Sequence, residues 1–399
     1  MSVSLSSIFS QVAHKQLVAV DLPHAGSHQH ELNGVTALKD FFGTHESKKA
    51  PIRWYYFADD VDPINESGSF KFYDARKKST DRTGRSEWRF YYTGSFLEHA
   101  GVNDWLVLVR TQQGEFLALV FQNASAWMRA GKALFAIPES QSEFKSLSED
   151  SLNSNEIRLL QSQILGELGL EVSVPTRPND EDLMLKKFGR TFPQTKEMSE
   201  FARLNVEVDP NDPDRTLVQW LEREEQLFRA LEGVIILERL KHGITSVDEF
   251  VKYSLSVQNR RKSRMGFALQ NQLSEIFSYH KLKFNAQAHT EGNNKPDFLF
   301  PGEKEYHDPR FSAAKLVMLG AKSTAKDRWR QVLVEADRIP SKHLCTLEPG
   351  ISTKQTEEMT RQNLTLVLPS PLLETYTDNQ RKALLSLQEF IDFVKKKQP

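Results

Sequence analysis

The sequence predicts two domains of different class: a β-rich domain over residues 1–172 and an α/β domain over residues 187–399. In the first domain, short aromatic runs recur between turn residues, which is typical of strands. In the second, short apolar runs alternate with long segments of helical periodicity, which favours an α/β fold. Residues 173–186 contain two prolines and an Asn-Asp-Glu-Asp run, so we expect a linker there.

Composition narrows the class of protein. The chain has 399 residues with 52 Lys plus Arg and 53 Asp plus Glu, and its net charge of −1 means that any strongly basic surface must be local. The single cysteine, Cys345, excludes an internal disulfide and fits a reducing compartment. The start of the chain lacks the pattern of a signal peptide, and there is no run of about 18 apolar residues. We therefore expect a cytoplasmic protein with no membrane partner.

In the N-terminal domain, aromatic runs predict five strands, at residues 54–57, 70–73, 88–92, 105–109 and 116–121. A helix over 156–168 is expected to close the domain, because its apolar residues fall on one face. The sequence here has no metal-ligand cluster and no glycine motif that cradles phosphate, so we expect no nucleotide cofactor.

Seven basic residues gather between positions 71 and 89, and only three acidic residues oppose them. They are Lys71, Arg76, Lys77, Lys78, Arg82, Arg85 and Arg89. A basic loop between two strands suits contact with the phosphates of a nucleic acid. The alternative is a solvated hairpin tip, which is what a run of charge usually forms.

In the α/β domain, apolar periodicity predicts a long helix over 214–242 and a terminal helix over 378–397. Ser246 and Glu249 have the spacing of a capping box for the next helix. A further helix is expected to open at a basic run made of Arg260, Arg261, Lys262 and Arg264. Because cations at a helix N-terminus oppose the macrodipole, we expect an approaching phosphate backbone to stabilise them. The alternative is a solvated helix start.

Three side chains beside the predicted strands suit phosphoryl chemistry. Apolar runs predict buried strands at residues 298–300, 316–321, 344–347 and 364–368. Asp297 opens the first strand, Lys322 ends the second, and Glu335 follows on what we expect to be a helix. Asp297 and Glu335 can hold Mg²⁺, which prefers carboxylate oxygens and lowers the pKa of a bound water. Lys322 can orient that water or stabilise the reacting phosphorus.

This combination is that of the PD-(D/E)XK nucleases, with one departure. The second acid of that motif usually lies two residues before the lysine, where this chain has Gly320. Glu335 can replace it if the helix after Lys322 folds back over the strand. The alternative is that Asp297, Lys322 and Glu335 are ordinary surface charges.

Four blocks in the same order resemble the catalytic domain of EcoRII-type restriction endonucleases: residues 258–264, 291–300, 306–308 and 322–331. The resemblance covers roughly residues 187–399. It implies a restriction-endonuclease-like core, with a central mixed sheet flanked by helices, that uses Mg²⁺ and the Asp297, Lys322 and Glu335 side chains. It also implies that Tyr306 lies close to the site. Gln270 stands where the family often has a glutamate, which puts a second metal ligand in doubt.

The resemblance further implies how the target is recognised. Lys326, Asp327 and Arg328 match a triplet that contacts a CC/GG half-site, and cations suit guanine while a carboxylate suits cytosine. The alternative for this triplet is an ion-paired first helical turn. A palindromic target in double-stranded DNA implies a homodimer, because one active site serves one strand.

In the N-terminal domain the resemblance is faint and rests on Gly26-Ser27-His28-Gln29 and on the basic loop. It implies a DNA-binding effector domain with the architecture of a β-pseudobarrel. His28 and Gln29 have the alternative of being ordinary loop residues.

The leading hypothesis is a type II restriction endonuclease that cuts at a short palindrome containing CC and GG. Two alternatives remain open from the sequence. The first is a modification-dependent nuclease gated by the N-terminal domain. The second is a DNA-binding protein whose nuclease core has weakened, which the glutamine at position 270 keeps open.

Overall fold

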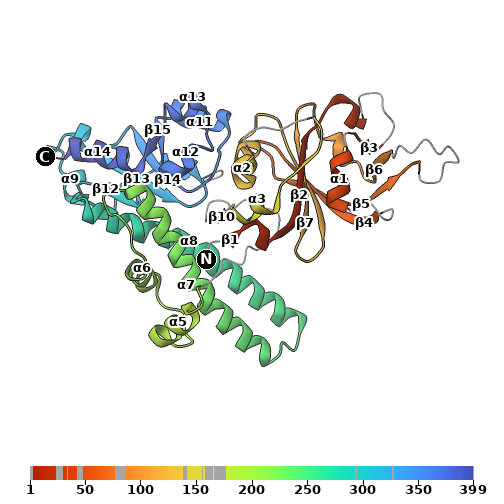
Figure 1. The fold of residues 1–399 in the computed structure, drawn as a ribbon. Helices are drawn as coiled ribbons and strands as arrows, with labels where there is room; N and C mark the ends of the chain where they lie inside the picture. The colour runs from red at the N-terminus through yellow and green to blue at the C-terminus, as the bar shows by residue number, and fades with distance from the viewer. Residues whose placement is uncertain are drawn as a thin grey trace. The chain divides into compact units, whose positions relative to one another are not determined.

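The computed structural model describes residues 3–23, 30–33, 35–42, 48–76, 87–137, 142–154, 156–157, 165, 177–292, 294–325 and 328–398. The chain divides into two compact units, Ser2–Val172 and Ser173–Pro399. Figure 1 shows strands dominating the first unit and helices around a sheet in the second. Within the described residues, every helix is too short or too polar to span a membrane.

The N-terminal unit is built on an eight-stranded sheet in the order β3-β6-β5-β4-β8-β7-β2-β9. Neighbouring strands are antiparallel except for β4 and β8, which are parallel. Each of the five strands predicted from aromatic runs is confirmed. The strands are β2 Phe9–Gln16, β3 Glu31–Leu32, β4 Lys48–Phe57, β5 Ile64–Asp74, β6 Trp88–Tyr92, β7 Trp105–Thr111, β8 Phe116–Phe121 and β9 Lys145–Ser146.

Both faces of this sheet are buried, which explains its density of aromatic residues. Side chains alternate along a strand, so Trp54 and Tyr56 enter one apolar cluster while Tyr55 and Phe57 enter the other. Helix α2, Ala126–Phe135, packs into the second cluster. Short elements complete the unit: η1 Leu5–Ser7, η2 Ala19–Asp21, η4 Val35–Ala37, α1 Leu38–Phe42, η5 Phe96–Glu98 and α3 Glu149–Ser154.

The helix predicted over 156–168 is wrong at its start. Glu156–Ile157 is a short strand, β10, which pairs antiparallel with β1, Val3–Ser4. Apart from position 165, the rest of that segment lies outside the described residues. Pairing with a distant strand overrides a local apolar pattern, which a single sequence does not reveal.

The C-terminal unit begins with four helices: α5 Asp180–Phe188, α6 Thr195–Leu204, α7 Pro213–Lys241 and α8 Val247–Tyr279. The predicted linker is therefore wrong for its second half, because α5 starts at Asp180 and packs against α7. Asp180 is buried and receives both terminal nitrogens of Arg223, at 2.8 and 2.7 Å. This bidentate pair fixes α5 to α7.

The long helix predicted over 214–242 is confirmed as α7, but the helix expected to open at the basic run is wrong. Ser246 caps α8 by accepting from the amide of Glu249, and α8 then continues for 33 residues. No proline and only one glycine, Gly266, interrupt that segment. The basic run therefore lies in mid-helix, where the macrodipole argument does not apply.

The C-terminal sheet has six strands in the order β11-β12-β13-β14-β15-β16. Strands β11 to β13 pair antiparallel and β13 to β16 pair parallel, so the mixed sheet predicted for this domain is confirmed. Phe277 of α8 packs on Phe298, Phe300 and Phe390, which places α8 and α14, Leu387–Lys397, against one face. The strands are β11 Asn285–Ala286, β12 Phe298–Phe300, β13 Val317–Lys322, β14 Lys342–Thr346, β15 Leu364–Leu368 and β16 Leu385–Ser386.

The terminal helix predicted over 378–397 is wrong as one element. Helix α13 ends at Arg381, β16 follows, and α14 starts after Ser386, whose side chain forms a capping box with Glu389. A serine followed by a glutamate three residues later is typical of a helix start. The remaining helices are α9 Glu303–His307, η6 Ala313–Lys315, α10 Trp329–Val332, α11 Thr353–Arg361, α12 Ser370–Leu373, α13 Asp378–Arg381 and α14 Leu387–Lys397.

Candidate active site at the carboxyl end of β13

Asp297 lies directly before β12 and is 4% exposed. Its Oδ2 accepts the backbone amide of Ala321 at 2.7 Å and Lys322 Nζ at 2.8 Å. Its Oδ1 accepts the side-chain nitrogens of Gln270 at 2.7 Å and Gln287 at 2.8 Å. Four donors thus converge on one carboxylate, two on each of its oxygens.

Lys322 is the last residue of β13, which pairs with β12 on one side and β14 on the other. The two strands explain how residues 25 positions apart meet, since Asp297 lies beside the end of its antiparallel neighbour. The lysine side chain is largely buried and forms an ion pair with Asp297. The pairing that the sequence suggested between the two strand ends is therefore present.

Glu335 reaches the same place by a different route from the one we expected. Helix α10 stops at Val332, and Glu335 lies in the bend that follows rather than on the helix. The chain does fold back over β13, because a Cβ on Gly320 would lie 3.0 Å from a methyl of Val332. Gly320, at the usual position of the second acid, leaves room for α10. The segment that follows α10 carries Glu335, a different acid.

The charges of Lys322 and Asp297 both act on the Glu335 carboxyl. Burial is the largest effect and raises the pKa of the Glu335 carboxyl to about 7; the Lys322 ammonium lowers it, and the Asp297 carboxylate raises it again. Its Oε2 is buried and has no hydrogen-bond partner among the described residues. Such an atom is costly unless a cation or a proton occupies it.

The three residues fit the divalent ion that the sequence implies. Within the described part of the chain, no group of three His, Cys, Asp or Glu side chains gathers as a ligand set. Mg²⁺ does not need one, because it commonly takes one or two carboxylates and completes its shell with water or phosphate. Asp297 and Glu335, whose Oε2 has no partner among the described residues, would supply those two carboxylates.

Tyr306 lies on α9 and is buried, but its hydroxyl is committed to other groups. It donates to Oε1 of Glu291 and accepts the backbone amide of Arg338 at 3.2 Å. The guanidinium of Arg338 in turn donates to the carbonyl of Tyr306 and, at 3.1 Å, to that of Asp308. Tyr306 thus braces the segment after Glu335, and none of its described bonds reaches Asp297 or Lys322.

The basic run in α8 serves structure more than the sequence suggested. Arg264 is buried and pairs with Glu224 and Glu225, so its predicted DNA contact is wrong. Arg261 pairs with Glu232 at 2.7 Å. The two remaining cations of the run, Arg260 over the ring of Phe192 and the exposed Lys262, stay candidates.

The basic stretch of the N-terminal unit is only partly described. Arg76 and Arg89 both pair with Glu87, at 2.8 and 2.6 Å, and Lys71 lies over the ring of Tyr73. The remaining candidates lie outside the described residues: Lys77, Lys78, Arg82 and Arg85, as well as His28 and Gln29. In the C-terminal unit the same holds for Lys326 and Asp327, whereas Arg328 is exposed at the start of α10.

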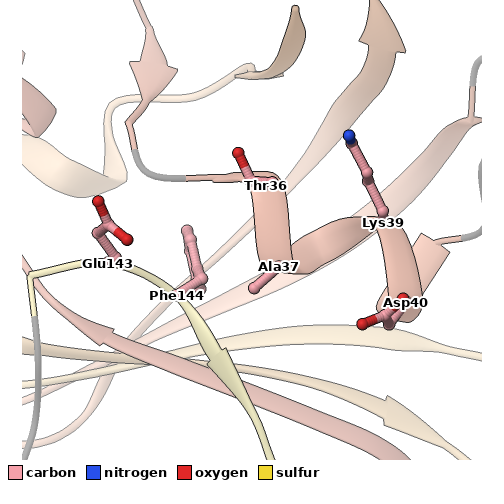
Figure 2. A pocket seen from close by; sticks show the side chains of 6 residues that line it. All are labelled: Thr36, Ala37, Lys39, Asp40, Glu143 and Phe144. Atoms are coloured by element: carbon pink, nitrogen blue, oxygen red, sulfur yellow. The ribbon is translucent and has the colours of Figure 1, made fainter. Parts of the chain in front are cut away.

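A hollow of about 470 Å³ lies in the N-terminal unit, far in sequence from the acidic site. Figure 2 shows its lining, with two acidic side chains and one lysine. The mixture does not supply the positive potential that a nucleic-acid backbone needs. The lining residues are Thr36, Ala37, Lys39, Asp40, Glu143 and Phe144.

The sequence did not indicate Gln287, the fourth donor to Asp297. Its side chain is exposed at the turn before β12, its φ of 52° is left-handed, and its backbone amide also donates to the Asp297 carbonyl at 3.1 Å. Nothing about an isolated glutamine marks such a role. The strand pairing that brings the turn over Asp297 is needed to see it.

Fold and site together define the class of domain. A mixed sheet carries Asp297 and Lys322 at the ends of adjacent strands, and the segment after α10 carries Glu335. This is the arrangement of PD-(D/E)XK domains. The model of the family described as EcoRII C terminal matches residues 228–391 of this chain.

A relative is the type II restriction enzyme EcoRII of Escherichia coli, which is 41% identical over 230 residues. The match covers 57% of this chain and 56% of that enzyme, so the chain spans about half the length of its relative.

The solved structures that match part of the chain are more distant in sequence. Metal-depleted Ecl18kI in complex with uncleaved, modified DNA has a TM-score of 0.44 and 15% identity, over 56% of this chain and 85% of that one. The complex of the restriction endonuclease PspGI with substrate DNA has a TM-score of 0.42 and 15% identity, over 54% of this chain and 95% of the other.

Proposed function

We propose that this protein is a type II restriction endonuclease, which hydrolyses double-stranded DNA with Mg²⁺ at a short palindrome containing CC and GG. The observation that carries the proposal is the approach of Lys322 and Glu335 to Asp297, in a domain that matches the EcoRII C-terminal family. Similarity to the Escherichia coli enzyme supports the reaction class.

Each side chain has a role in this proposal that follows from its surroundings. Asp297 and Glu335 would hold Mg²⁺, which when bound supplies charge neutralisation at the scissile phosphate and an acidified water. Lys322, whose ammonium already donates to Asp297 at 2.8 Å, is placed to orient a water or to stabilise charge on the phosphorane oxygens. Tyr306 contributes through the position of Glu335, not through contact with the reacting atoms.

The target and assembly follow from the resemblance and from symmetry. Lys326, Asp327 and Arg328 would contact a CC/GG half-site through the major groove. A palindrome requires two catalytic domains related by a two-fold axis, so we propose a homodimer. A cytoplasmic location would give the enzyme access to DNA.

We also propose that the N-terminal unit binds DNA and regulates cleavage. Its support is the basic stretch, and above all the four cations outside the described residues. Replacing Lys77, Lys78, Arg82 and Arg85 together by serine should weaken DNA binding and reduce its dependence on salt, since fewer counterions are released. Unchanged salt dependence in a filter-binding assay would remove this loop from the DNA interface.

A second candidate function has one specific observation in its favour. Where the family often has a glutamate, Gln270 donates to Asp297 rather than offering a third carboxylate. A weakened nuclease that mainly binds DNA would result if that carboxylate is essential. Gln270→Glu should then raise the rate of plasmid nicking well above that of the native chain, whereas an equal or lower rate argues for a competent native site.

The direct test of the proposed activity uses supercoiled plasmid containing CC/GG palindromes. The native chain should linearise it with Mg²⁺, and Lys322→Ala should lower the rate by about 10³-fold or more while leaving DNA binding in Ca²⁺ intact. Mapping the ends gives the target, and parallel digestion of methylated plasmid separates a conventional enzyme from a modification-dependent one. Retained cutting by Lys322→Ala would remove the lysine from the mechanism.

A further inference from the structure

The bend that carries Glu335 is held by side chains from distant parts of the C-terminal unit. On one side of Glu335, the Val334 carbonyl accepts Asn294 Nδ2 at 2.8 Å. On the other side, the Ala336 carbonyl accepts Lys342 Nζ at 3.1 Å. The two carbonyls that flank the acid in the chain are therefore both fixed.

The next two backbone amides are fixed as well, and Glu291 is common to both. Glu291 Oε2 accepts the amide of Asp337 at 3.0 Å. Glu291 Oε1 accepts the hydroxyl of Tyr306, and that hydroxyl accepts the amide of Arg338. One carboxylate thus holds two consecutive amides, the first directly and the second through a buried tyrosine.

These bonds replace a secondary-structure ladder that is absent at this point. Helix α10 has ended at Val332 and β14 begins only at Lys342. Ala336 also adopts a left-handed φ of 54°, which costs a non-glycine residue about 1–2 kcal/mol. A bend of this kind keeps one conformation only if surrounding groups hold it.

No hydrogen bond from the described residues holds Oε2 of Glu335. The position of this oxygen therefore depends strongly on the backbone that bears the side chain. Any group that fixes this backbone therefore also fixes where a cation would meet the second carboxylate.

We propose that Glu291 is a positioning residue that sets the place of the Glu335 carboxylate, acting through the Asp337 amide and the Tyr306 hydroxyl. The inference rests on the proposed function, in which Glu335 is a metal ligand. Tyr306 would act through the same hydrogen bonds, by holding the amide of Arg338. Groups that orient metal ligands typically change metal affinity or activity by about 10–100-fold when removed.

The test measures Mn²⁺ binding to the DNA-free protein by electron paramagnetic resonance, together with the Mg²⁺ concentration that half-saturates cleavage. Glu291→Ala should weaken Mn²⁺ binding by about tenfold or more and raise the half-saturating Mg²⁺ to match. Glu291→Gln should stay within about threefold of the native chain, since its amide oxygen can still accept Asp337 and its nitrogen can reach the Tyr306 oxygen.

Glu238→Ala is the matched control, because it removes the same charge from an ion pair with Arg190, away from the Glu335 bend. Its metal affinity should equal that of the native chain. Asn294→Ala, which removes only the bond to Val334, should give a smaller loss than Glu291→Ala in the same direction. It serves as the test variant if Glu291→Ala does not fold.

Hydrogen exchange gives a readout that needs no metal and no activity. Glu291→Ala should deprotect the amides of Asp337 and Arg338 and leave α8 unchanged. The inference is overturned if Glu291→Ala and Asn294→Ala both bind Mn²⁺ as tightly as the native chain while Glu335→Gln does not. A native chain that binds Mn²⁺ through Glu335 but never cuts DNA refutes the proposed function alone.

Discussion

The two carboxylates of the site, Asp297 and Glu335, differ in their hydrogen-bond partners. Asp297 accepts hydrogen bonds from four donors, two on each oxygen. Glu335 has a buried oxygen with no partner among the described residues and a pKa raised to about 7, chiefly by burial. The comparison indicates that Asp297 stabilises the fold through its hydrogen bonds, whereas Glu335 has an oxygen available for a cation.

The largest expected difference between the two acids appears when each is neutralised in turn. Asp297→Asn removes an acceptor from Ala321 and Lys322, so it should lower the free energy of unfolding by about 2–4 kcal/mol and abolish cleavage. Glu335→Gln should abolish cleavage without that loss. Chemical denaturation of both variants checks this, and equal destabilisation would contradict the contrast.

Metal binding should depend on pH through Glu335. A carboxylate must lose its proton to bind a cation, and a pKa of about 7 means that Glu335 is largely protonated below that pH in the metal-free protein. The apparent Mn²⁺ affinity should therefore fall by up to about tenfold per pH unit below pH 7. An apparent Mn²⁺ affinity that does not change between pH 5.5 and 7 would show that Glu335 is already ionised in this range.

The same carboxyl should destabilise the metal-free protein at high pH. Its folded pKa of about 7 lies above the unfolded value of 4.5, so the folded state binds the proton more tightly and stability falls as pH rises from 4.5 to 7. Glu335→Gln should thus be more stable than the native chain at pH 8, by about 1–2 kcal/mol, and nearly equal at pH 4.5. Thermal unfolding in the presence of a chelator at both pH values measures the difference.

A smaller effect on stability and on the Mg²⁺ requirement is expected from the packing of α10 on β13. A methyl group on Gly320 would meet Val332 at 3.0 Å, so Gly320→Ala should push α10 away from β13 and cost about 1 kcal/mol or more. It should also raise the Mg²⁺ requirement slightly, because α10 leads into the bend of Glu335. Unchanged stability together with unchanged Mg²⁺ dependence would mean that α10 can shift without moving the acid.

Sequence patterns predicted the buried strands. The apolar run 298–300 and the aromatic run 88–92 coincide with β12 and β6, since strand burial leaves its period in the sequence. Asp297 and Lys322 could be paired because both lie at the ends of such runs. The role of Glu335 followed once Gly320 was recognised as a departure.

Other features could not be predicted, for reasons that are physical. Arg264 looks like any exposed cation in the sequence, and only the packing of α8 on α7 buries it against Glu224. Glu291 accepts a backbone amide from a residue 46 positions away, and Gln287 donates to a carboxylate 10 positions away. Such contacts leave no local pattern in the sequence. The continuous α8 was missed because a basic run resembles an element boundary when nothing shows that the helix has already begun.

The measurement that tests the central claim most directly is the number of Mn²⁺ ions bound per chain, by electron paramagnetic resonance at pH 8 without DNA. The native chain should show a site that Asp297→Asn and Glu335→Gln each weaken by about tenfold or more and that Glu238→Ala leaves intact. Equal binding by the native chain and both site variants would contradict a metal site shared by these two carboxylates.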